Sequence, residues 1–234
     1  PIGKASAETA PLTIDVDFNP DKALRMRFNY DNRLSSDFWF KSSKDSFDLK
    51  SGKVRIGTSN IIWKKVPGIQ VAGSFAELDV QKWQDAFAKL PSDLSSPKLL
   101  DNLQFVDMKL RAISIWGQNY TNVAIKANKL DNDNWSIFLD QQNIAGDLRY
   151  QRSSNTLSGR FPRIKLSKSL LSKNKANNTM STLKPTDLPN LNIAVDLFKL
   201  DEVVMGSVGL KSTSVKDHWH LDTCTIKSPA YQLT

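Results

Sequence analysis

Apolar and polar side chains alternate in short runs along most of this chain. Residues 24–30 are the clearest case, with an apolar side chain at every second position: Leu24, Met26, Phe28 and Tyr30. A period of two residues is that of a β-strand with one buried and one solvated face. Such runs return near residues 106–111, 123–127 and 191–195, and Ser51-Gly52 is predicted to be a turn between two strands. We therefore predict a mainly β fold of short antiparallel strands.

One stretch changes to a helical period. After the alternating residues 69–75, apolar side chains recur at spacings of three and four, at Val80, Trp83, Phe87 and Leu90. Asp79 precedes them as a predicted N-cap, and Pro91 follows them. The pattern predicts one short amphipathic helix over about 79–90, with Trp83, Phe87 and Leu90 packed against the apolar face of the sheet. Two roles stay open for these three residues, a plug that fills a bend in the sheet and a gate over it.

Two segments repeat the same order of features. Each has Asn-Leu, a glycine, an alternating strand (residues 123–127 and 208–212), a polar turn and a tryptophan, Trp135 or Trp219. Repeats of this kind stack, because one copy cannot bury its apolar face alone. We predict an elongated, curved sheet that can be extended at either end. Its predicted parts are a first meander over 12–78, the helix over 79–91, a repeat unit over 100–166, a flexible basic loop over 167–187 and a second repeat unit over 188–234.

The chain begins with Pro1 and ends in a strand-like run. We therefore expect residues 1–234 to be one continuous segment of a longer protein.

Catalysis, metal binding and nucleic-acid binding find little support in the sequence. It has no nucleophile elbow, no phosphate-binding loop and no dinucleotide fingerprint, so we expect neither an enzyme nor a cofactor. His218 and His220 flank Trp219 and are the two histidines of the chain, which falls short of a metal ligand set. The net charge is +8, but the basic residues are scattered, and the cluster near the 167–187 loop lacks aromatic partners. That cluster is either a solvated loop or a contact for anionic lipid headgroups.

Several runs in order resemble one known family. They are Ser51-Gly-Lys-Val-Arg-Ile-Gly57, Val66-Pro-Gly-Ile-Gln-Val-Ala-Gly73, Leu78-Asp-Val-Gln-Lys-Trp83, Leu188-Pro-Asn-Leu-Asn-Ile193 and Gly206-Ser-Val-Gly-Leu210. Together they resemble the YhdP branch of the AsmA-like proteins of Gram-negative bacteria. The resemblance implies a long chain, anchored in the inner membrane by a helix outside this segment, whose periplasmic part is a β-sheet folded into an open groove. It further implies transport of phospholipid toward the outer membrane, with acyl chains held on the apolar face, and with envelope proteins as further partners.

The apolar residues have two interpretations. By composition alone they are the core of a closed sandwich or barrel, whereas the resemblance makes them the lining of a lipid groove. In the second case we expect eight residues to face lipid tails: Met26, Phe28, Phe105, Met108, Ile125, Ile137, Ile193 and Leu210. Phe105 is out of phase with Met108, so both can face the same side only across a bulge. The alternative function is a non-catalytic structural module of the cell envelope that binds protein or glycan at its edge.

Overall fold

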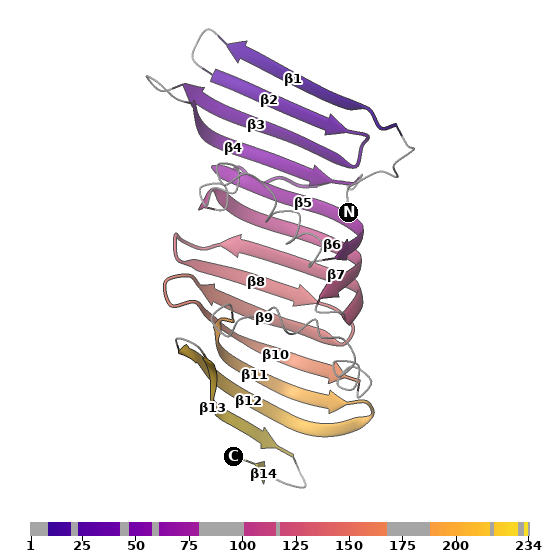
Figure 1. Cartoon of the computed structure of the whole chain (residues 1–234), viewed down its shortest axis with the longest axis vertical. Coiled ribbons are helices and arrows are strands. Elements are labelled where there is room, and N and C mark those ends of the chain that lie inside the picture. Colours follow the sequence, from indigo (N-terminus) through magenta and orange to yellow (C-terminus); the bar gives the residue numbers. More distant parts are fainter. Residues whose placement is uncertain are drawn as a thin grey trace. The chain divides into compact units, whose positions relative to one another are not determined.

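The computed structural model describes residues 9–19, 23–42, 47–57, 61–79, 101–115, 118–167, 188–215, 218–228 and 232–233. The mainly β prediction is confirmed (Figure 1). The predicted helix over 79–90, with Trp83, Phe87 and Leu90, lies outside the described residues beyond Asp79. So does the predicted loop over 167–187, apart from Ser167.

The chain divides into two compact units, Pro1–Ile113 and Ser114–Thr234. The strands of the first unit are β1 (Leu12–Asn19), β2 (Ala23–Tyr30), β3 (Leu34–Ser42), β4 (Phe47–Ile56), β5 (Gly68–Asp79) and β6 (Leu103–Ile115), which runs two residues past the boundary. Those of the second unit are β7 (Gln118–Lys129), β8 (Asn134–Asp140), β9 (Ile144–Gln151), β10 (Thr156–Leu166), β11 (Asn190–Leu200), β12 (Val203–Val215), β13 (His218–Lys227) and β14 (Gln232–Leu233). In each unit the strands lie side by side in chain order.

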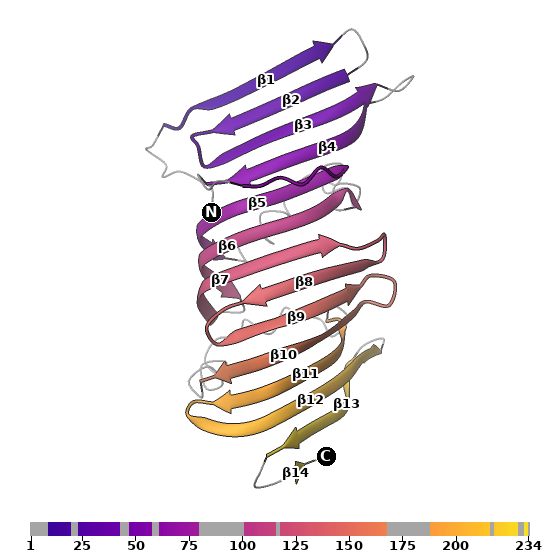
Figure 2. The same cartoon turned by 180° about the vertical axis from the view of Figure 1, so that it is seen from behind.

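The strand pairs whose register the structure describes are antiparallel with two exceptions. β5 runs parallel to β4, and β11 runs parallel to β10. A parallel neighbour needs a connection that returns across the sheet, and residues 61–67 belong to the one between β4 and β5. This segment lies against the polar face of the first unit, where it is seen in front of the strands in Figure 2. The buried side chain of Gln70 holds it there, because its amide accepts from the Lys64 N–H at 2.9 Å and donates to the Lys64 carbonyl at 2.8 Å.

The turn predicted at Ser51-Gly52 is wrong, since both residues lie inside β4. The register between β3 and β4 shifts beside them, between Trp39 and Phe40. Gly52 instead makes room for a ring: a Cβ added there would lie 2.6 Å from Phe38 Cδ1 and 3.3 Å from Ile69 Cγ1. The glycine therefore serves packing on the apolar face and ends no strand.

Cross-strand charge pairs organise the opposite, polar face. Arg25 donates from Nε and Nη2 to the two carboxylate oxygens of Asp37, at 2.9 and 2.8 Å, and its guanidinium lies 4.5 Å from the ring centroid of Trp39. The hydrogen bonds from Arg25 hold the pKa of Asp37 below its usual value. In the second unit, Arg160 Nε donates to both carboxylate oxygens of Asp196, at 2.9 and 3.0 Å, and this pair is more exposed to solvent. Each unit thus has one polar and one apolar face, as the alternation predicts.

Candidate functional site

The apolar face of the second unit consists of rows of side chains that cross its strands. Residues directly opposite each other on paired strands point to the same face, so the printed registers define each row. One row joins six strands: Ile137, Leu148, Gly159, Ile193, Leu210 and Cys224. At about 4.8 Å between neighbouring strands it spans about 24 Å. The row carries no charged side chain and no hydrogen-bonding side chain other than the thiol of Cys224.

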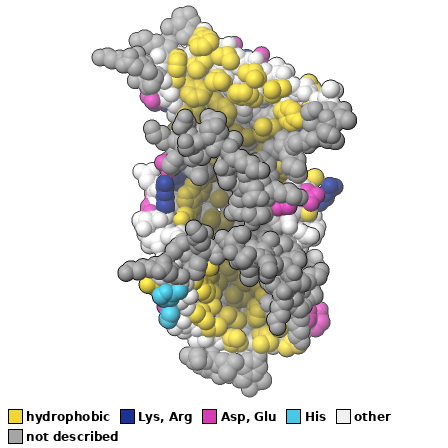
Figure 3. Space-filling view, in the orientation of Figure 1, with side chains coloured by type: hydrophobic (Ala, Val, Ile, Leu, Met, Phe, Trp, Pro, Cys, Tyr) yellow, Lys and Arg dark blue, Asp and Glu magenta, His cyan; other side chains and the backbone are white. Residues whose placement is uncertain are grey.

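Two further rows flank this one. In the first of them, Ile125 stands opposite Leu139, and Leu139 stands opposite Gly146. Gly146 leaves space for the ring of Phe161, because a Cβ added at Gly146 would lie 2.6 Å from Phe161 Cδ1. From Phe161 the row continues on β11 to β13 through Val195, Val208 and Ile226. On the other side a third row holds Trp135, Tyr150, Leu157, Leu191, Ser212 and Leu221. The three rows make a broad apolar surface, seen as the hollowed yellow area in the lower part of Figure 3.

The structure brings four of the predicted lining residues together on this surface. Ile137, Ile193 and Leu210 share the central row, and Ile125 lies in the neighbouring one. All four are half-buried. Among the described residues of the second unit, the strands form a single open layer, and no described element packs over this surface.

Met26 and Phe28 lie on the apolar face of the first unit. Met26 stands between Val16 and Phe38, and Phe28 between Ile14 and Ser36. β1, at the edge, exposes four apolar side chains on this face: Leu12, Ile14, Val16 and Phe18. Figure 3 shows a yellow area over β1 to β4 on this face. This surface is chemically similar to that of the second unit.

Phe105 and Met108 are both 8% exposed in β6. Three positions apart in a strand, they point to opposite faces wherever the alternation is regular. The ring of Phe105 lies beneath the ammonium of Lys64, with Nζ 4.3 Å from the ring centroid. Lys64 belongs to the segment that covers the polar face, so Phe105 is in contact with this covering segment.

Several members of the rows are not among the eight predicted lining residues. Leu148, Val195, Val208 and Cys224 become part of the surface only through cross-strand register. Register shifts accompany this arrangement, between Arg160 and Arg163, between Val195 and Lys199, and between Lys211 and Ser212. No sequence signal marks any of them.

Metal and membrane-spanning features are absent from the described part of the chain. It holds no group of three or more His, Cys, Asp or Glu side chains arranged to bind a metal ion. His220 Nδ1 lies 2.8 Å from the carboxylate of Asp222, on the exposed side of β13. No helix within the described ranges has the length and hydrophobicity needed to span a membrane.

The fold and this surface define a class of protein, one built of repeated β-meanders with an apolar face on each unit. The model of the family described as "YhdP protein" matches residues 1–234, so the chain belongs to the YhdP family, which confirms the resemblance. No curated relative matches the sequence significantly. A solved structure, the sex pheromone staph-cAM373 precursor, aligns with 83% of this chain and 74% of its own at 9% identity, with a TM-score of 0.16.

Proposed function

We propose that this chain is a segment of a periplasmic protein, tethered to the inner membrane through a part not included here, that carries phospholipid toward the outer membrane. The acyl chains lie on the apolar face, and the headgroup stays at its rim in water. The observation that carries the proposal is the uninterrupted central row of the second unit, from Ile137 to Cys224. Membership of the YhdP family supports it.

The dimensions and chemistry of the row suit an acyl chain. One lipid leaflet is half of a hydrocarbon core about 30 Å thick, or about 15 Å, and the row is longer than that at about 24 Å. Each methylene that leaves water for an apolar surface contributes roughly 0.8 kcal/mol. Binding therefore needs no polar recognition group, and the proposal involves no catalytic step.

The single cysteine allows a direct test, because Cys224 ends the central row. The purified chain, labelled at Cys224 with a benzophenone maleimide and illuminated with radiolabelled phospholipid, is expected to form a covalent lipid adduct. The matched control carries Thr223→Cys with Cys224→Ser, which moves the label by one residue to the polar face, where Thr223 is exposed opposite Lys211. Equal labelling at the two positions, or none at Cys224, contradicts the proposal.

A structural module that binds a partner at its edge is the second candidate. One observation favours it: within the described residues β1 pairs with β2 alone, and its apolar side chains are exposed, Phe18 at 73%. An unprotected edge of this kind can pair with another strand. Lipid extraction and mass spectrometry of the purified chain separate the two candidates, since the structural module predicts no co-purified phospholipid.

A further inference from the structure

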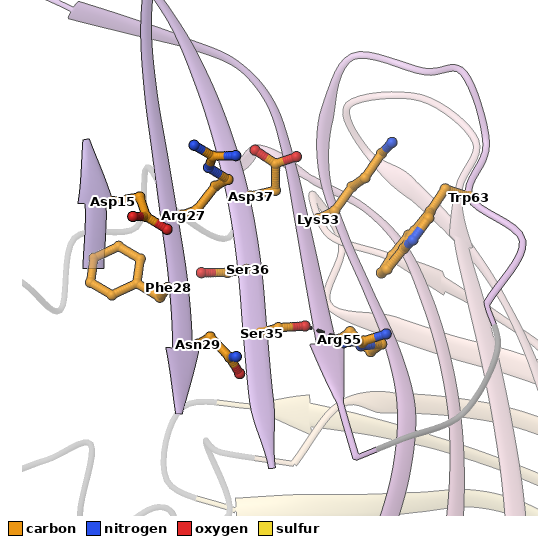
Figure 4. A pocket seen from close by; sticks show the side chains of 10 residues that line it. All are labelled: Asp15, Arg27, Phe28, Asn29, Ser35, Ser36, Asp37, Lys53, Arg55 and Trp63. Atoms are coloured by element: carbon orange, nitrogen blue, oxygen red, sulfur yellow. Dashed lines mark hydrogen bonds between the residues drawn. The ribbon is translucent and has the colours of Figure 1, made fainter. Parts of the chain in front are cut away.

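A pocket of about 420 Å³ lies on the polar face of the first unit, opposite that unit's own apolar face (Figure 4). Its volume is in the usual range for small-molecule sites. The side chains that matter come from β2, β3, β4 and the segment after β4: Arg27, Asn29, Ser35, Lys53, Arg55 and Trp63. None of them takes part in the proposed lipid transport.

One row of charges across the pocket is internally balanced. The row consists of Asp15, Arg27, Asp37 and Lys53, which are cross-strand neighbours in that order on β1 to β4. Each charged side chain therefore has a neighbour of the other sign. Arg27 also binds Asp17 at 2.7 Å, and Asp37 binds Arg25. Most of the charge in this row is therefore compensated by cross-strand partners. Lys53, at the end of the row, has Asp37 beside it, but that carboxylate is already held by Arg25.

The adjacent row leaves one cation without a carboxylate. Arg55 stands opposite Ser35, which stands opposite Asn29, and none of these neighbours is acidic. Arg55 donates from Nε to Ser35 Oγ at 3.1 Å, and it forms no ion pair within the described part of the chain. Its terminal nitrogens are therefore available as a donor fork that matches carboxylate or phosphate. Lys53 is two residues away on the same face of β4, so the two cations reinforce each other.

An aromatic ring stands beside these cations. In Figure 4, Trp63 lies on the segment next to β4, with its ring on the same side of the pocket as Lys53 and Arg55. The backbone beside Trp63 is fixed, because the buried side chain of Gln70 hydrogen-bonds both the N–H and the carbonyl of the next residue, Lys64. A half-buried indole offers a flat face for a ring-shaped ligand and an N–H for a hydrogen bond. The amide of Asn29 and the hydroxyl of Ser35 add groups suited to sugar hydroxyls.

We propose that this pocket binds an acidic saccharide, a sugar that carries a carboxylate or a phosphate. The sugar ring stacks on Trp63, the anionic group binds Arg55 and Lys53, and hydroxyl groups reach Asn29 and Ser35. This site acts independently of the apolar rows of the second unit, because it shares no residue with them.

The test is calorimetric titration of the purified chain with four probes: trigalacturonic acid, glucose 6-phosphate, maltotriose and inorganic phosphate. The two acidic sugars are expected to bind at least about tenfold more tightly than maltotriose or phosphate, a difference that requires both the ring and the charge. Equal affinity for inorganic phosphate reduces the site to an anion site and overturns the proposal. Affinity for maltotriose equal to that for the acidic sugars would show that the cations play no role, and it overturns the proposal. The proposal is also overturned if neither acidic sugar binds.

Variants assign the binding to this pocket. Arg55→Gln and Trp63→Ala are each expected to weaken acidic sugar binding by at least about fivefold. The controls are Trp39→Ala, a tryptophan of β3 on the same polar face but outside the pocket lining, and Arg111→Gln on β6. Circular dichroism checks that all four variants fold. Unchanged affinity in folded Arg55→Gln and Trp63→Ala contradicts the assignment.

Discussion

Ile193 on β11 stands directly opposite Leu210 on β12, and the pair continues on both sides into the central apolar row of the second unit. Both side chains are branched aliphatics of nearly equal size, and neither offers a hydrogen bond. A lipid chain that lies here meets similar contacts when it moves by one strand. The proposed surface therefore holds acyl chains without fixing their position, as a conduit requires.

An acidic residue on this surface should block it, whereas the same residue on the other face should not. Ile125→Asp places a carboxylate among the apolar rows, and Lys126→Asp places one on the polar face of the same strand. We expect Ile125→Asp to lower phospholipid transfer between vesicles by the full-length protein about tenfold, because an uncompensated charge beside hydrocarbon costs at least ~1.4 kcal/mol. Lys126→Asp should change the rate less than about twofold. If the two variants fold and transfer lipid equally, the alternation has no functional meaning.

Gly206 should be required for the stability of the second unit. Its φ is +95°, a region that side chains disfavour, and a Cβ there would collide with the backbone carbonyl of Lys227. We expect Gly206→Ala to lower the free energy of unfolding by about 1–3 kcal/mol. Gly209→Ala, three residues along β12, is the control, because a Cβ there meets only the rotatable hydroxyl of Thr225. Urea unfolding measures both, and equal losses would count against a backbone origin.

Two turns of the second unit should make its stability depend on acidic pH. Asp131 accepts hydrogen bonds from the backbone N–H groups of Asp133 and Asn134, each at 2.8 Å, and Asp133 accepts from the N–H and hydroxyl of Ser153. These hydrogen bonds lower the pKa of both aspartates in the folded state. Their stabilisation is present above the ordinary aspartate pKa and is lost as the pH falls through the lowered values.

The measurement is the urea midpoint between pH 7 and pH 2. The double variant Asp131→Asn with Asp133→Asn should show a smaller loss below about pH 4 than the unmodified chain, whereas Asp48→Asn, an exposed residue of β4, should follow the unmodified chain. Parallel curves for all three would exclude the turns as the source.

The ion pair of Arg25 with Asp37 should be worth more than that of Arg160 with Asp196. The first pair is 33% and 28% exposed and the second 74% and 44%, and exposed pairs are weakened by solvent screening. Double-mutant cycles with Arg→Gln and Asp→Asn should give a coupling energy of about 0.5–1 kcal/mol for the first pair and less than about 0.5 kcal/mol for the second. Coupling that is larger for the second pair would contradict this ranking.

Local alternation predicted most strands, because a strand that buries one face has an apolar side chain at every second position. Residues 24–30 are an example, since they fall within β2, which spans Ala23–Tyr30. The parallel placement of β5 beside β4 left no such trace, because a strand alternates in the same way whichever direction its neighbour runs. The glycine of Ser51-Gly52 was misread as a turn because its role is to leave space for Phe38, and that contact depends on a residue of another strand.

The candidate site could also be predicted only in part, from local pattern but not from cross-strand contacts. Choosing Ile137, Ile193 and Leu210 needed only their place in alternating runs, but their meeting in one row depends on register and on bulges. The polar-face pocket was missed because Trp63 joins Arg55 only through the segment that returns between two parallel strands.

The parallel pair of β10 and β11 has a consequence for how copies of the repeat are arranged. β7 and β12 carry matching residues, Lys126 with Lys211 among them, and they lie five strands apart. In a purely antiparallel sheet, strands separated by an odd number of steps run in opposite directions, so alternate copies would be inverted. The single parallel step restores the direction, and β7 and β12 run the same way. Trp135 and Trp219 therefore lie at the same rim of the sheet, and the two copies of the repeat have the same strand direction.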